Sequence, residues 1–224
     1  MKLTFTILFA FLIGLFFCGM LTLAFANGAY VAATEDVAPT AEHEFHEHPQ
    51  KVSFASDGPL GKFDRAQLQR GLKVYAEVCA ACHSLNQVAF RDFAALGYNE
   101  AEVKAIASKA TVSAKDPLTG EVKDRPGLPA DKFPPVVYAG VGNPPDLSLI
   151  TKAREGGAAY IYSLLTGFQN PPANLPAELK PGTGLHYNPY FPNLNLAMAK
   201  PLNDGQVTYA DGTKASVDQM AKDV

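Results

Sequence analysis

The stretch "EVCAACHSL", residues 77–85, decides how this chain is interpreted, because it holds two of the three cysteines. Cys79 and Cys82 are separated by two residues, and His83 follows directly. Such a pair can form a disulfide, half of a zinc site, a redox dithiol or an attachment site for haem. The rest of the sequence has to distinguish between these four possibilities.

Three of the four possibilities fit the sequence poorly. A structural zinc site usually takes two cysteine pairs, or one pair with two spaced histidines, and the chain has no second pair. A thioredoxin-like dithiol follows a strand in an alternating strand–helix pattern, whereas here a helix is expected to run into the motif. A plain disulfide leaves His83 without a role.

Covalent haem attachment gives all three residues a role. Two thiols one helical turn apart can add to the two vinyl groups on one edge of the porphyrin, and His83 can then bind the iron. Met198, in the loop "NLNLAMAKPL", is the expected second axial ligand, and His186 is the alternative. Because two axial ligands leave no place for a substrate, this pattern predicts electron transfer and no bond chemistry by the chain alone.

The composition excludes some classes of protein. The chain has 224 residues, of which 47% are hydrophobic, so it can bury a substantial core. Its net charge of −3 argues against a nucleic-acid-binding protein, which normally carries a basic face. Its 17 prolines predict that much of the chain runs as extended loops.

The N-terminus resembles an export segment. Lys2 precedes a long apolar run that ends in Ala24-Phe25-Ala26, as in a secretory signal peptide cleaved after Ala26. An uncleaved membrane anchor is the alternative, and both place the remainder across the membrane from Lys2. Since the segment lacks an Arg-rich transit region, the sequence predicts a bacterial protein at the periplasmic face of the inner membrane.

Residues 27–57 are expected to form an acidic tether ahead of a domain that spans residues 58–224. His43, His46 and His48 in "HEFHEH" could bind a metal. A solvated tether is the preferred interpretation of this tract. Its carboxylates could also attract a basic partner.

Capping patterns predict the main helices. Helix starts are expected at Asp64, at Asn99 with Glu102, and at Ser216, and the helix begun at Ser216 stops after about two turns. Gly71 inside the first helix suggests that another helix crosses closely. A short helix capped by Asp146 or Ser148 is expected to run through Arg154. Another is expected over "AAYIYSLLT", ending at Gly167.

Two further segments have turn-forming sequences. The passage from residue 115 to 148 has too many prolines and glycines for regular structure to be expected. "VTYADGT", residues 207–213, predicts a small β-hairpin around an Asp-Gly turn. The prediction is therefore a mainly α fold with long proline-rich loops and a small hairpin.

Several stretches together carry a family resemblance. They are "GPLGKFDRAQLQRGLKVYAEVCAACHSL", "DRPGLPADKFPP", "PPDLSLITKAREGG", "YIYSLLTGF", "GLHYNPYF", "LAMAKPL" and "VTYADGTKASVDQMAKDV". In these the chain resembles the cytochrome c1 family, the haem subunit of the ubiquinol–cytochrome c reductase (cytochrome bc1) complex. The resemblance implies a cytochrome c-like haem domain with one covalent haem c.

The resemblance also assigns roles to individual residues. It implies that Cys79 and Cys82 form the thioether bonds and that His83 and Met198 bind the iron. Arg125 in "DRPG" matches an arginine that pairs with a haem propionate, and Tyr138 is expected to approach a propionate too. Tyr187, Tyr190 and Phe191 are expected to line the haem crevice.

The resemblance has two departures and one functional implication. The loop "VVYAGVGN" is shorter than in the family, and the chain stops before the family's C-terminal membrane anchor.

The function that the resemblance implies is electron transfer from the Rieske iron–sulfur protein to a soluble or membrane-bound cytochrome c, beside cytochrome b. A free periplasmic mono-haem cytochrome serving a dehydrogenase is the alternative. A thiol oxidoreductase or metal-binding module is a less favoured alternative function.

Overall fold

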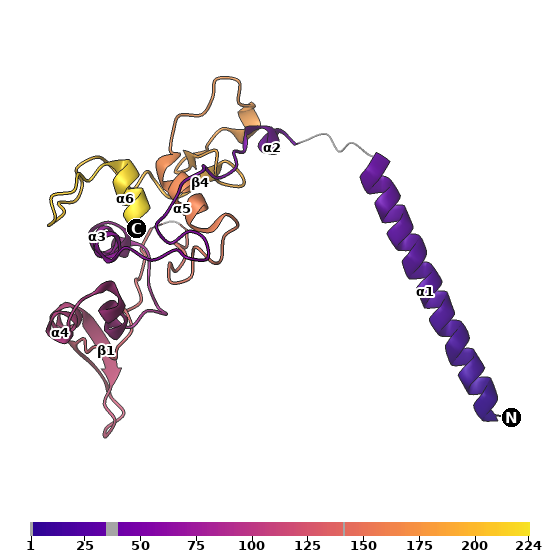
Figure 1. Cartoon of the computed structure of the whole chain (residues 1–224), viewed down its shortest axis with the longest axis horizontal. Coiled ribbons are helices and arrows are strands. Elements are labelled where there is room, and N and C mark those ends of the chain that lie inside the picture. Colours follow the sequence, from indigo (N-terminus) through magenta and orange to yellow (C-terminus); the bar gives the residue numbers. More distant parts are fainter. Residues whose placement is uncertain (1, 35–39, 141) are drawn as a thin grey trace. The chain divides into compact units, whose positions relative to one another are not determined.

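The protein is described by a computed structural model, which covers residues 2–34, 40–140 and 142–224 (Figure 1). Glu35 and Asp36, two of the acidic residues of the expected tether, lie outside the described residues. The chain divides into two units, Met1–Thr40 and Ala41–Val224. The α-helices are α1 (Lys2–Thr34), α2 (Ala41–Phe45), α3 (Arg65–Glu77), α4 (Glu100–Ser108), α5 (Gly157–Thr166) and α6 (Val217–Asp223). The 3-10 helices are η1 (Cys79–Ala81), η2 (Phe90–Leu96) and η3 (Ala177–Leu179), and the strands are β1 (Thr111–Lys115), β2 (Val122–Pro126), β3 (His186–Tyr187) and β4 (Asn195–Leu196).

Helix α1 contains the apolar N-terminal run. The part from Thr6 to Thr34 is 29 residues long, and its length and composition would allow it to cross a membrane. At about 1.5 Å per residue it measures roughly 44 Å, more than the ~30 Å hydrocarbon core of a bilayer. The helix continues through Ala26, the position expected for signal cleavage.

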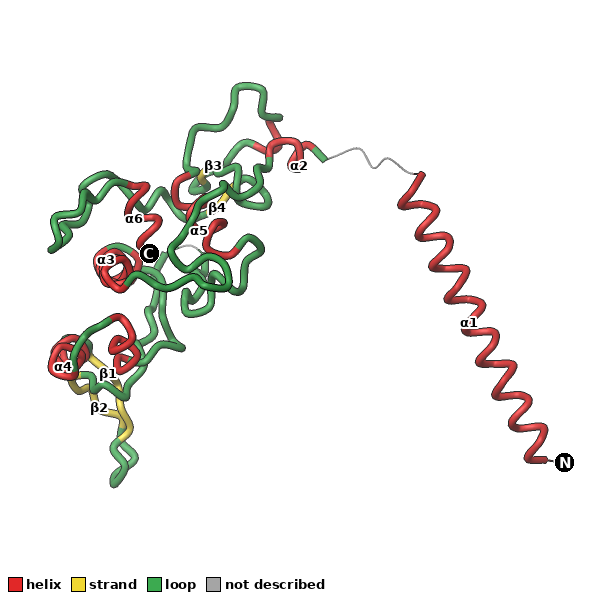
Figure 2. Tube along the Cα trace, viewed as in Figure 1, coloured by secondary structure: helices red, strands yellow, loops and turns green. Residues whose placement is uncertain are grey.

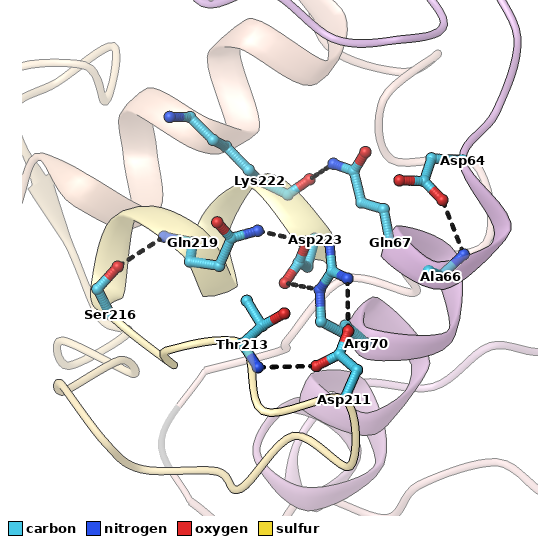
Figure 3. A network of polar contacts seen from close by, with 10 residues as sticks. All are labelled: Asp64, Ala66, Gln67, Arg70, Asp211, Thr213, Ser216, Gln219, Lys222 and Asp223. Carbon is cyan, nitrogen blue, oxygen red and sulfur yellow. Dashed lines mark hydrogen bonds and ion pairs between the residues drawn. The ribbon is translucent and has the colours of Figure 1, made fainter.

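Helices α3 and α6 cross closely, as Gly71 suggested. A Cβ atom at Gly71 would lie 1.9 Å from the carbonyl oxygen of Asp223, so only glycine allows this approach. The Arg70 guanidinium binds the Asp223 carboxylate at 3.0 and 3.1 Å and Asp211 at 2.9 Å (Figure 3). The Asp223 side chain is 0% exposed, so this ion pair is buried in the crossing.

The helix starts follow the predicted caps. The Asp64 carboxylate accepts from Ala66 N, and Asn99 and Glu102 form a reciprocal capping box at α4. The Ser216 hydroxyl accepts from Gln219 N at the start of α6. Apolar residues of α3 and α6 pack into one core cluster with the 202–215 segment, and η2 and α4 form a second cluster.

The β-hairpin lies elsewhere than predicted. Strands β1 and β2 pair antiparallel from Thr111↔Pro126 to Lys115↔Val122, so the passage after residue 115 does contain regular structure (Figure 2). Asp116 allows this by accepting from Leu118 N and Thr119 N in the connecting turn. Residues 207–213, all described, form a turn without strands, because Val207 and Tyr209 are buried in the α3–α6 cluster. The prediction of a hairpin there was wrong.

Residues 45–50 of the expected tether contact the rest of the domain. Phe45 packs against the core cluster of Leu175, Tyr187 and Leu194. Gln50 N donates to the Ser163 hydroxyl at 2.8 Å on helix α5. Sequence reasoning missed this because the contacts join residues more than a hundred positions apart. Among the residues that the structure describes, no group of three or more His, Cys, Asp or Glu side chains is placed to hold a metal ion.

Candidate haem site

The Cys-x-x-Cys-His motif forms a tight turn at the end of α3. Cys79 begins the 3-10 helix η1, and the Cys79 carbonyl accepts from Cys82 N at 3.1 Å and from His83 N at 2.9 Å. Both thiols are partly buried, and neither is joined in a disulfide. The turn therefore presents two thiols and an imidazole from five consecutive residues.

The imidazole of His83 has one nitrogen already engaged. Its Nδ1 lies 2.8 Å from the carbonyl oxygen of Pro145. Because a carbonyl oxygen can only accept, Nδ1 carries the proton in this contact and Nε2 keeps its lone pair. A ring fixed in this way through one nitrogen is ready to bind a metal through the other.

The chain that follows the motif is joined to the loop of residues 136–148. Ser84 accepts twice, from Leu147 N at its carbonyl (2.9 Å) and from Val136 N at its hydroxyl (2.7 Å). The Asp146 carboxylate accepts from Asn86 N at 2.7 Å, and the Ser148 hydroxyl accepts from Gln87 N at 3.0 Å. These bonds fix the position of the Pro145 carbonyl against His83.

Asp146 and Ser148 have a different role from the one predicted. They do not begin a helix, since residues 148–156 form turns. Burial opposes the charge of Asp146, but hydrogen bonds from Asn86 and Ser148 outweigh it and lower the pKa of Asp146. Sequence reasoning missed both residues as part of the site. The fragment "PPDLS" indicates that these side chains accept hydrogen bonds from main-chain amides. It does not indicate that the amides belong to a segment about sixty residues earlier.

The Cys79 thiol is not activated as a nucleophile by its surroundings. Burial, with a smaller contribution from the neighbouring Cys82, raises the pKa of Cys79 to about 11. Reactive cysteines of oxidoreductases have lowered pKa values, because the thiolate is the nucleophile. The environment of Cys79 therefore does not match that of a catalytic thiol.

The two residues predicted to meet the propionates lie in different settings. Arg125, in β2, makes two hydrogen bonds to Asp131, at 2.6 and 2.9 Å. The guanidinium hydrogen bond is the main cause that lowers the pKa of Asp131. Tyr138 lies two residues after Val136 in the loop joined to Ser84, and it is 41% exposed. Among the described residues, no hydrogen bond or ion pair links Arg125 to the motif.

One candidate for the second axial ligand lies within the short β3–β4 strand pair, and the other lies just after it. His186 is exposed in β3, where it pairs with Leu196 of β4. Met198 follows β4 by two residues and is partly buried. Tyr187 and Tyr190, predicted to line a crevice, are both buried.

Comparisons with known proteins place the chain in a family. The family model described as "Cytochrome C1 family" matches residues 54–224. The chain belongs to the cytochrome c1 family. Cytochrome c1 family proteins carry one covalently bound c-type haem.

Curated members of the cytochrome c1 family are similar over most of the chain. A "Cytochrome c1 1, heme protein, mitochondrial" of Arabidopsis thaliana is 42% identical over 209 residues, 88% of this chain and 65% of that protein. A "Cytochrome c1-2, heme protein, mitochondrial" of Solanum tuberosum is 43% identical over 208 residues, 88% of this chain and 77% of that protein. The Saccharomyces cerevisiae "Cytochrome c1, heme protein, mitochondrial" is 42% identical over 199 residues, 85% of this chain and 63% of that protein. The chain thus spans about two thirds of the length of these relatives.

The residues of the motif fit a c-type haem. The Cys79 and Cys82 thiols are both unbonded to other cysteines and lie on one turn. His83 has its Nδ1 engaged and its Nε2 available. This donor set, two thiols and one oriented imidazole, is the one that covalent attachment and axial ligation require.

Proposed function

We propose that the chain carries electrons through one covalently bound haem c within the ubiquinol–cytochrome c reductase complex. It would accept one electron from the Rieske iron–sulfur protein and pass it to a soluble or membrane-bound cytochrome c. The observation that carries this proposal is the turn in which Cys79, Cys82 and His83 lie together, with His83 oriented by the Pro145 carbonyl. Membership of the cytochrome c1 family supports it.

The roles of the residues follow from their chemistry. A bound haem supplies one-electron redox chemistry at its iron. Cys79 and Cys82 would hold the macrocycle through thioether bonds, and His83 would bind the iron through Nε2. The hydrogen bond from His83 Nδ1–H to Pro145 makes the imidazole a stronger donor. Met198 would provide the second axial ligand, which favours ferrous iron and raises the potential.

We also propose that Arg125 and Tyr138 bind the propionates. The guanidinium of Arg125 binds the carboxylate of Asp131 in a two-point contact, the geometry that also suits a propionate, and its side chain is 35% exposed. A propionate would share the guanidinium with Asp131. Tyr138 would contribute its hydroxyl from the loop that is joined to Ser84.

The partners and the location are proposed from the relatives. A Candida albicans relative, 42% identical over 199 residues, is named "Cytochrome b-c1 complex catalytic subunit, mitochondrial". We infer that this chain likewise assembles with cytochrome b and the Rieske protein, with α1 in the membrane or removed as a signal. The relatives named above are mitochondrial, and the bacterial periplasmic face stays a prediction from the N-terminal sequence.

Two measurements test the proposal. Protein matured with a haem-attachment system should give the c-type band in a reduced pyridine haemochrome spectrum, and C79S/C82S should lose it. In the assembled complex, rapid-mixing kinetics should show the haem reduced by the Rieske centre and reoxidised by cytochrome c. A c-type haem without either transfer would favour a free mono-haem cytochrome. Absence of the band would favour a thiol or metal-binding module.

A further inference from the structure

The loop that leads to Met198 contains the most unusual backbone in the described part of the chain. Leu194 is the single described non-glycine residue with a positive φ, at 65°. Bulky side chains adopt this conformation at a cost, so the surroundings must hold it there. Leu194 is 0% exposed and lies four residues before Met198. A buried residue in a strained conformation therefore lies shortly before Met198.

The loop closes on itself around this residue through several hydrogen bonds, among them Phe191 N to Asn188 O and Tyr190 N to Asn188 Oδ1, both at 3.1 Å. Leu194 N donates to Phe191 O at 2.8 Å, and Asn188 N donates to Leu194 O at 2.8 Å. Strands β3 and β4 pair over two residues each. So short a ladder is marginal by itself, and other parts of the chain must contribute to its position.

Residues 45–50 supply contacts from outside the loop, and we call them the strap. Phe45 packs against the cluster that contains Tyr187 and Leu194. Glu47 N donates to the carbonyl of Pro189 at 2.8 Å. Burial and the neighbouring Glu47 carboxylate raise the pKa of Tyr190. The strap thus contacts the 187–194 loop through packing, a main-chain hydrogen bond and a side-chain charge.

The strap is also attached to the helical part of the domain. Gln50 N donates to the Ser163 hydroxyl at 2.8 Å, and Gln50 Nε2 donates to the Thr166 hydroxyl at 3.3 Å. Both residues lie on α5. From the other side, the buried Asn188 donates to Leu164 O of α5 at 2.8 Å. The loop is therefore enclosed between α5 and the strap.

We propose that the strap positions Met198 as the axial ligand, with Phe45 as its main contact. The proposal rests on the assignment of Met198 to the iron under the proposed function. Phe45 packs against the cluster of Leu175, Tyr187 and Leu194, so it would act on the ligand through Leu194 and is a positioning residue. It acts by keeping Leu194 in its strained conformation, so that β4 delivers Met198 from a fixed starting point.

The test uses the haem-loaded full chain and the far-red band that sulfur ligation gives to oxidised haem. F45A should weaken this band and raise the affinity for added imidazole about tenfold, which corresponds to roughly 1.4 kcal/mol lost from the closed loop. Amide hydrogen exchange of residues 187–196 should also become faster. F45L, which keeps an apolar side chain, should show smaller changes and serves if F45A fails to fold.

Three control variants separate the possible outcomes. F63A removes a ring of the same size from a position that is 72% exposed, and it should leave the band and the imidazole affinity unchanged. E44A changes an exposed residue of α2 and should change neither. M198L should abolish the band. If M198L abolishes the band while F45A leaves band, affinity and exchange unchanged, the strap proposal alone is overturned. If M198L retains the band, the ligand assignment in the proposed function fails first.

Discussion

Helix α3 is held in different ways at its middle and beyond its end. At its middle, residue identity decides the contact with α6: Arg70 binds the buried Asp223 carboxylate, and the absence of a side chain at Gly71 makes room for the Asp223 carbonyl. Beyond its end, most contacts of the haem motif involve main-chain groups, such as the Pro145 carbonyl at His83 and Leu147 N at Ser84. A contact between side chains depends on the identity of two residues. A contact between main-chain groups depends on the path of the loop.

The largest effect is expected at the middle of α3. R70M leaves the Asp223 carboxylate buried without its partner, and the side chains of this pair are 15% and 0% exposed. Loss of one partner of a buried pair costs about 3–5 kcal/mol of unfolding free energy. Urea denaturation of the full chain in detergent measures it. K73M, which breaks the exposed pair of the same helix with Glu77, should cost less than about 1 kcal/mol. Equal losses would contradict the buried-pair interpretation.

The next effect concerns the thiols of the turn. In haem-free protein carrying C18S, alkylation of Cys79 at pH 8 should be roughly two orders of magnitude slower in the folded chain than in urea, where the pKa returns to about 8.5. The physical reason is that burial raises the pKa of Cys79 to about 11, so little thiolate is present at pH 8. The measurement is the alkylation rate of Cys79 by mass spectrometry. A folded rate equal to the unfolded rate would support a reactive thiol.

A smaller effect is expected where a side chain supports the main-chain contacts. D146A removes the acceptor of Asn86 N and Ser148 N and should cost about 2 kcal/mol, typical of hydrogen bonds to a charged group. The matched control is D116A, because Asp116 makes a similar pair of bonds within the exposed hairpin turn.

The effect of Asp146 should depend on pH in a defined direction. The folded pKa of Asp146 lies below its ordinary value of 3.8. The stabilisation is therefore complete well above that value and is lost as the pH falls through the folded pKa. Unfolding curves of the wild type and D146N should converge in strong acid. A difference that persists there would mean that the charge of Asp146 is not responsible.

The smallest effect is expected at Gly71. G71A places a Cβ atom against Asp223 O, and overpacking of this kind costs about 1–3 kcal/mol, from which the better helix propensity of alanine subtracts about 1 kcal/mol. G182A, at a position with open space, is the control. Denaturation midpoints compare the two variants. Stabilisation by G71A would show that α6 moves away at little cost.

Local sequence signals predicted the helices well. Asp64, Asn99 and Ser216 act on main-chain amides two or three residues away, so short patterns reveal them. The close crossing of another helix at Gly71 was predicted correctly. Glycine is unfavourable inside a helix, so close packing is a good explanation for its presence there. The haem motif was also local, since five consecutive residues contain it.

The errors arose where a residue acts at long range. Asp211 was expected to turn a hairpin, but its carboxylate binds Arg70, 141 positions earlier. Asp146 was expected to cap a helix, yet it accepts from Asn86, 60 positions earlier. The strap was expected to be solvated, because nothing within residues 41–50 indicates that α5 and the 187–194 loop will meet it. Such contacts depend on the assembled fold.

The sequence separations at the motif also bear on the order of events during synthesis. The turn from Cys79 to His83 closes over four residues, whereas the bonds from Pro145 and Val136 close over 62 and 52. Short closures form faster than long ones, so the turn can exist while the later chain is still unfolded. For a chain that receives a covalent haem, this early period leaves the thiols accessible to the attachment machinery. Once residues 136 and 145–148 have folded onto the motif, both thiols are partly buried, and the raised pKa of Cys79 makes that thiol slow to react.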